Sequence, residues 1–145
     1  MEKRDFNKNW ICRCLTREEP EKKVTLPHDA MRSEQRSEES QGEGNIGWYI
    51  GGDYEYTKRF FVPAEDVDKE AVLEFEGVYH DAEIYINEKK AAFRPYGYTN
   101  FYVELNEFLQ YGAENTIRVI ARNADQPNSR WYSGTGIYRP VNLYL

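Results

Sequence analysis

The feature that most constrains this chain is a period of two: apolar and polar residues alternate in short runs that end at turn residues. In residues 54–62, the clearest run, Tyr54, Tyr56 and Val62 share one face, and Pro63 ends the run. Successive side chains of a β-strand point to opposite faces of the sheet, whereas an amphipathic helix repeats every 3.6 residues. The alternation therefore predicts β-strands, and the sequence shows almost no helical periodicity.

Similar runs follow one another along the chain. Strands are expected at residues 5–15, 54–62, 71–76, 80–86, 91–93, 101–105, 115–122 and 141–145, with a short extended piece at 24–27 and one helical turn at 107–109. Seven or eight strands at this spacing are typical of a β-sandwich or jelly roll. No internal repeat or second domain is visible, so residues 1–145 are expected to form one all-β domain. Because the last strand runs to the final residue, we expect a chain cut at a domain boundary.

Charge and hydropathy argue against two classes of partner. Nineteen basic residues against twenty-five acidic ones give a net charge of −6, and no basic cluster offers the positive footprint that nucleic acid needs. No stretch approaches the roughly 20 apolar residues of a membrane span, and the N-terminus lacks the apolar core of a secretory signal. We therefore expect a cytoplasmic protein that binds neither nucleic acid nor membrane.

The two cysteines, Cys12 and Cys14, are separated by one residue. On a strand they point to the same face and are poorly placed to bridge each other. With only His28 and His80 as further soft donors, they give a weak metal signal. We expect two reduced thiols, no metal and no cofactor.

The sequence offers no supported catalytic pair. Glycoside hydrolysis by the chain itself would need two carboxylates held roughly 5–9 Å apart. Most acidic residues are expected on solvated strand faces or turns, as at Glu65, Asp66, Asp68 and Glu70, and none has a motif around it. The nucleophile elbow, the P-loop, the dinucleotide-binding fingerprint and the HExxH zinc motif are also absent from the sequence. We therefore predict no catalytic residue in this chain.

Two segments between strands, residues 94–101 and 123–140, combine planar aromatic side chains, amides, arginine and glycine. Sugar recognition uses this mixture, because flat rings stack on C–H surfaces while amides and guanidinium groups bind hydroxyls. The alternative is purely structural. In that case the aromatic residues, Tyr96, Tyr98, Trp131 and Tyr132, only cap the open end of the sandwich.

Seven pieces of the sequence occur in an order that is characteristic of one family. They read RDFNKNW, LPHDA, GWYIGG, KRFFVP, LEFEGVYHDAEIYINEKK, GYTNF with LNEFLQYGAENTIRVIARN, and SGTGIYRPVNLYL. Together they resemble, over nearly the whole chain, the N-terminal sugar-binding domain of glycoside hydrolase family 2, the β-galactosidase and β-glucuronidase family. The chain departs from the family pattern at Ala30, at residues 54–58 and at the turn Asn87-Glu88, where a tryptophan, a Gly-Trp-Tyr-Arg-Lys run and an Asn-Gly turn are usual.

The resemblance implies a galactose-binding-domain-like jelly-roll β-sandwich from a retaining exo-β-glycosidase, with β-galactosidase favoured over β-glucuronidase or β-mannosidase. In such enzymes an immunoglobulin-like domain and a TIM barrel follow, and the barrel holds both catalytic glutamates. This domain would then brace the barrel, bind a β-galactoside or related glycan jointly with it, and contribute residues to the rim of its sugar pocket. The candidate rim residues are Asp125, Asn128, Ser129, Arg130 and Trp131, followed by Arg94 and Tyr96.

Two other functions remain open from the sequence. A free-standing carbohydrate-binding module would need an exposed aromatic platform and its own affinity for glycans. A structural spacer would need neither, and residues 123–140 would be dispensable for activity.

Overall fold

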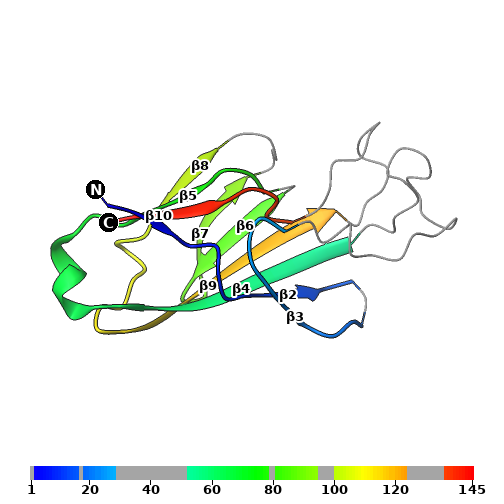
Figure 1. Cartoon of the computed structure of the whole chain (residues 1–145), viewed down its shortest axis with the longest axis horizontal. Coiled ribbons are helices and arrows are strands. Elements are labelled where there is room, and N and C mark those ends of the chain that lie inside the picture. Colours follow the sequence, from blue (N-terminus) through cyan, green and yellow to red (C-terminus); the bar gives the residue numbers. More distant parts are fainter. Residues whose placement is uncertain (1, 17, 29–51, 79–80, 95–99, 124–135) are drawn as a thin grey trace, which may run out of the picture.

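The computed structural model describes residues 2–16, 18–28, 52–78, 81–94, 100–123 and 136–145, which form two antiparallel β-sheets (Figure 1). The four-stranded sheet has the order β1 (Lys3–Asp5), β10 (Val141–Tyr144), β5 (Val72–Phe75) and β8 (Phe101–Glu104). The six-stranded sheet has the order β3 (Lys22–Val24), β2 (Trp10–Cys14), β4 (Gly52–Val62), β9 (Ala113–Asn123), β6 (Ala82–Ile86) and β7 (Lys89–Arg94). The predicted all-β jelly-roll sandwich is confirmed. No helix in these ranges is long and apolar enough to cross a membrane.

The longest pairing joins β4 to β9 in the middle of the six-stranded sheet. Eleven residues of each strand are paired without a break, from Gly52 opposite Asn123 to Val62 opposite Ala113. The strand predicted at residues 54–62 and that predicted at 115–122 are thus both confirmed, each slightly longer than expected.

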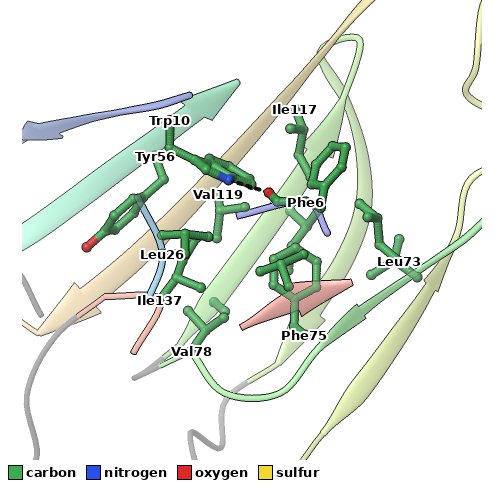
Figure 2. Packing of buried hydrophobic residues seen from close by; sticks show 14 of the residues in the cluster. Phe6, Trp10, Leu26, Tyr56, Leu73, Phe75, Val78, Ile117, Val119 and Ile137 are labelled. Atoms are coloured by element: carbon green, nitrogen blue, oxygen red, sulfur yellow. Dashed lines mark hydrogen bonds between the residues drawn. The ribbon is translucent and has the colours of Figure 1, made fainter. Parts of the chain in front are cut away.

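The core lies between the two sheets and is filled by the inward-facing residues of the alternating runs (Figure 2). The indole of Trp10 is fully buried, and its Nε1 donates a hydrogen bond to the carbonyl of Phe6 at 2.8 Å. Lys58 also donates to this carbonyl, and its Nζ lies 3.9 Å from the centroid of the Phe6 ring. Burial lowers the pKa of Lys58 to about 8. The ammonium group of Lys58, which lies on the inward face of β4, is therefore held by the carbonyl and the ring of Phe6.

The predicted strand at residues 5–15 is wrong in one respect, because the structure divides it into β1 and β2. The chain changes sheets between them, and Asn9 takes a left-handed φ of 64°. Asn7 holds the chain in place at this crossing. Its side-chain Oδ1 accepts a hydrogen bond from the backbone amide of Val141, and its backbone amide donates to the carboxylate of Asp5. Three polar residues in a row, 7–9, interrupt the alternation at this break, a signal that the single predicted strand did not take into account.

One further local prediction is confirmed and another is corrected. The helical turn expected at 107–109 is present: the amides of Phe108 and Leu109 both donate to the carbonyl of Leu105, and the bond from Leu109 has the spacing of an α-helical turn. Asp66 was expected in solvent but lies buried in a short 3-10 helix, Ala64–Asp68. Its carboxylate is 2.9 Å from Nζ of Lys69, and this ion pair makes the burial tolerable.

The turn between β6 and β7 shows how the chain replaces the usual Asn-Gly pair. Asn87 and Glu88 have φ values of 49° and 65°, the mirror-image geometry of a tight hairpin. The side chain of Asn87 fits this turn, since its amide donates to Phe108 and Asn115 and its oxygen accepts from Thr116. Glu88 pairs with Arg118 at 3.2 Å, but most of its side chain is exposed.

We expect Glu88→Gly to raise the free energy of unfolding by about 0.5 kcal/mol. Relief of a left-handed conformation is worth roughly 1–2 kcal/mol, from which the extra flexibility of glycine in the unfolded chain and a weak surface ion pair must be subtracted. Urea unfolding of the 145-residue chain measures the change. Glu88→Gln is the control, because it removes the charge and keeps the strained Cβ, and it should lower stability slightly. A Glu88→Gly variant less stable than Glu88→Gln would contradict this account of the turn.

Candidate functional site

Both segments predicted to recognise sugar leave the sandwich at the same end. Strand β9 ends at Asn123, which is paired with Gly52 at the start of β4. Strand β7 ends at Arg94, which is paired with Ala82 at the start of β6. Strands β8 and β10 begin beside the end of β5. We call this end of the sandwich the loop end.

The described ranges contain Arg94 among the predicted rim residues. Arg94 is exposed at the loop end, and its guanidinium carbon lies 5.4 Å from the centroid of the buried Phe101 ring. The cation therefore covers the edge of the core, which is a structural role whether or not it also meets a ligand. The other predicted residues lie outside the described ranges, and their role stays a prediction: Tyr96, Asp125, Asn128, Ser129, Arg130 and Trp131.

A fully buried tyrosine, Tyr56, joins three sequence motifs near the loop end. Its hydroxyl lies 2.7 Å from Nδ1 of His28, within hydrogen-bond distance, and the two rings meet edge to face. The amide of His28 donates to the carbonyl of Ile137 at 2.8 Å. The LPHDA piece, the central strand β4 and the SGTGIYRP piece are thus tied together at one point.

Gly136 completes this contact, because only glycine fits there. A Cβ at this position would overlap the hydroxyl of Tyr56, and the backbone φ is 118°, a value that side-chain-bearing residues rarely adopt. Neither Tyr56 nor Gly136 was predicted as a site residue. The available signals were the glycine spacing of SGTGIYRP and the histidine of LPHDA, which the sequence could not connect.

The outer face of the six-stranded sheet has a charged cluster next to the loop end. Arg122 donates from Nε to Glu83 at 2.7 Å and from Nη1 to Asp53 at 3.4 Å, and Tyr85 donates to Glu83 at 2.8 Å. Burial acts to raise the pKa of Glu83, but the hydrogen bonds from Arg122 and Tyr85 outweigh it and hold that pKa below its usual value. A carboxylate held ionised in this way is unsuited to donate a proton to a leaving group.

Glu74, on the outer face of the four-stranded sheet, is also held ionised, although no arginine in the described ranges contacts it. Its buried carboxylate accepts hydrogen bonds from Asn100, Tyr102, Asn142 and Tyr144, at 2.9–3.1 Å. Burial again opposes ionisation, and the four neutral donors hold the pKa of Glu74 below its usual value. Glu74 is therefore no general acid either.

The cysteines lie on one face of β2, as predicted, and both are buried free thiols. Burial raises the pKa of Cys12 to about 11, so its thiol stays protonated and unreactive at neutral pH. Within the described ranges, no group of three or more His, Cys, Asp or Glu side chains is arranged to hold a metal ion.

Comparison with known proteins gives one consistent result. Residues 47–145 match the family model described as the sugar binding domain of glycosyl hydrolases family 2. A β-galactosidase from Bacteroides ovatus is 43% identical over 121 residues, which cover 83% of this chain and 14% of that protein. A putative β-glucuronidase from Formosa agariphila is 32% identical over 96% of this chain and 14% of its own length.

Solved structures agree with these relatives. A β-glycosidase from Bacteroides vulgatus superimposes with a TM-score of 0.90 at 30% identity, over 99% of this chain and 20% of that chain. A glycosyl hydrolase family 2 member from Bacteroides cellulosilyticus gives a TM-score of 0.89 at 27% identity over the same shares. The chain thus spans only a seventh to a fifth of the length of these four proteins.

The contact between Tyr56 and Gly136 can be tested by a double-mutant cycle in the 145-residue chain. Gly136→Ala should lower the free energy of unfolding by about 3 kcal/mol or more, through overlap with the hydroxyl and backbone strain. Tyr56→Phe removes the overlapping oxygen and should recover about 1 kcal/mol or more of that loss. Gly112→Ala is the matched control: φ is also positive, at 73°, but the nearest atom would be 3.3 Å from the new Cβ. Equal losses for the two glycine variants, with no recovery by Tyr56→Phe, would contradict the proposed overlap.

Proposed function

This chain belongs to the family of glycosyl hydrolases family 2 sugar-binding domains, and from that premise we propose that it is the non-catalytic N-terminal domain of a retaining exo-β-glycosidase. The observation that carries the proposal is the partial coverage: a relative that is 43% identical over most of this chain devotes only 14% of its length to the match. The remaining length would hold the barrel and the two carboxylates that retaining hydrolysis requires.

We propose a β-galactosidase as the parent enzyme. The β-galactosidase of Bacteroides ovatus has the higher identity, 43% against 32% for the putative β-glucuronidase of Formosa agariphila. The two substrates differ at two positions: a glucuronide has a carboxylate where a galactoside has a hydroxymethyl, and their C4 hydroxyls have opposite configurations. Purified parent enzyme, assayed on nitrophenyl β-galactoside and nitrophenyl β-glucuronide, tests this choice directly. A larger kcat/KM on the glucuronide would contradict it.

Within the parent, the domain would brace the barrel and contribute residues from its loop end to the rim of the sugar pocket. Three observations support this role. The segments after Arg94 and Asn123 start from the same end of the sandwich, and the Tyr56–His28 contact with Gly136 fixes the point where the second segment returns. Paired hydrogen bonds from a guanidinium in this segment suit either a sugar diol or a carboxylate of the barrel.

The isolated 145-residue chain should hydrolyse no nitrophenyl glycoside. Two strongly hydrogen-bonded carboxyl groups of the described ranges, Glu74 and Glu83, have lowered pKa values and are therefore unsuited to serve as the acid. Pure protein assayed at high concentration checks this expectation. Turnover that disappears when one of its own acidic residues is replaced would overturn the non-catalytic assignment.

In the complete parent enzyme, Arg130→Ala and Trp131→Ala should each lower kcat/KM by roughly ten-fold or more, which corresponds to about 1.4 kcal/mol. Arg4→Ala is the control, because Arg4 lies on β1 and pairs only across the surface with Glu2 at 3.1 Å. The melting temperature of the isolated domain should change little for Arg130→Ala, since surface arginines rarely contribute much to folding. Wild-type kinetics for both variants, or unfolding of the domain by Arg130→Ala, would return this segment to a structural role.

A further inference from the structure

A groove crosses the outer face of the six-stranded sheet, away from the loop end. Its volume is about 600 Å³, within the range of small-ligand sites. It runs over β2, β4 and β9 to the turn between β6 and β7, strands that lie side by side in Figure 1. The residues that carry the argument below are Ile11, Thr57, Arg59, Glu88, Thr116 and Arg118. We call it the cross-strand groove.

Arg118 is the most firmly positioned side chain of the groove. Its guanidinium stacks on the ring of Tyr85 with 4.3 Å between carbon and centroid. Its terminal nitrogens pair with Glu88 at 3.2 Å and with Glu55 at 3.6 Å. A planar donor held from three sides is pre-organised, so little side-chain entropy is lost when a ligand binds to it.

None of these contacts gives the Nε of Arg118 a hydrogen-bond acceptor. It is buried and has no hydrogen-bond partner, the one such side-chain atom found in the described part of the chain. A buried N–H without an acceptor is costly and rare in folded proteins. Because this nitrogen is buried, a ligand oxygen would accept its hydrogen bond only after a small shift of the Arg118 side chain towards the groove, and that shift would relieve the cost.

The remaining lining favours a neutral, hydroxyl-rich ligand. Thr57 and Thr116 offer hydroxyl groups that both donate and accept, and Ile11 offers an apolar contact for C–H groups. The charges on the outer face are balanced, with Arg59 and Arg118 against Glu21 and Glu88. A phosphate-rich or strongly acidic ligand would need a clear excess of positive charge. Three inter-strand steps of about 4.8 Å make the path from β2 to β6 about 14 Å long, which suits an extended chain better than a single ring.

From these observations we propose that the cross-strand groove binds a neutral oligosaccharide, as a second carbohydrate site separate from the loop end. The choice of a carbohydrate rests on the proposed function in a glycoside hydrolase, while the choice of a neutral and extended one rests on the groove itself. The site would hold a distant part of a long substrate while its end is processed elsewhere in the parent.

The test is an NMR titration of the ¹⁵N-labelled 145-residue chain with β-1,4-galactotetraose, and in parallel with tetragalacturonic acid as the acidic analogue. The neutral tetrasaccharide should shift the amides of Thr57, Thr116 and Arg118, with a Kd on the order of 1 mM. Arg118→Lys keeps the charge but removes Nε and the planar stacking, so it should weaken binding about ten-fold. Thr116→Val should weaken it about three-fold through loss of one hydroxyl.

Arg122→Lys is the matched control, because it makes the same change four residues along the same strand and outside the groove. It should leave the titration unchanged, and thermal unfolding should confirm that all variants are folded. The proposal is overturned by the absence of groove shifts at about 10 mM tetrasaccharide, ten-fold above the expected Kd. This is the result expected if the groove is a contact surface for another domain of the parent and has no affinity for sugar. Equal effects of the two arginine variants, or tighter binding of the acidic analogue, would also overturn it. None of these outcomes bears on hydrolysis by the parent, so the groove and the proposed function fail independently.

Discussion

Eleven residues of β4 pair with eleven of β9 without a bulge, and the arrangement of everything else follows from this one ladder. Because side chains alternate across a strand, the register that sends Tyr56 and Val119 into the core also sends Thr57 and Arg118 to the outer face. The same register brings the start of β4 and the end of β9 together, which defines the loop end. A slip by one residue would exchange the core with the groove, so the fold and both candidate sites depend on one set of backbone hydrogen bonds.

Period-two alternation predicts the fold because it reports directly on which face of a strand is buried. It predicted β4, β6 and β9 well, since each of these strands has one face in the core and one outside. It failed at the break between β1 and β2, where the chain changes sheets while Phe6 and Trp10 both still point inward. It failed again at Asp66, because the Lys69 partner that makes burial possible leaves no periodic trace.

The candidate site was only partly predictable for a different reason. The contact of His28 and Tyr56 spans 28 positions, and Gly136 is a further 80 along the chain, so no local pattern links them. Family motifs named two of the three residues without their roles. For Arg94 the sequence predicted a ligand contact, and the structure shows a cation that covers the Phe101 ring. A planar cation at the edge of a core is suited both to covering an aromatic ring and to binding a ligand. Residue type alone therefore could not tell which of these two roles Arg94 has.

Two carboxylates in the described ranges, Glu74 and Glu83, show how hydrogen bonds keep an acidic group ionised where burial opposes it. Glu83 is held ionised by Arg122 and Tyr85, and Glu74 by four neutral donors on neighbouring strands. A general acid needs the opposite environment, in which burial wins and the proton is retained near neutral pH. Most of these donors come from strands already fixed by the sheet, so they are pre-organised around the carboxylates. The same rigidity that makes these carboxylates poor acids makes the outer faces good templates: Arg118, held by Tyr85, Glu55 and Glu88, presents a donor to a ligand without first having to be ordered. The outer faces of the sheets are therefore suited to binding a ligand, whereas Glu74 and Glu83 are poorly suited to proton transfer.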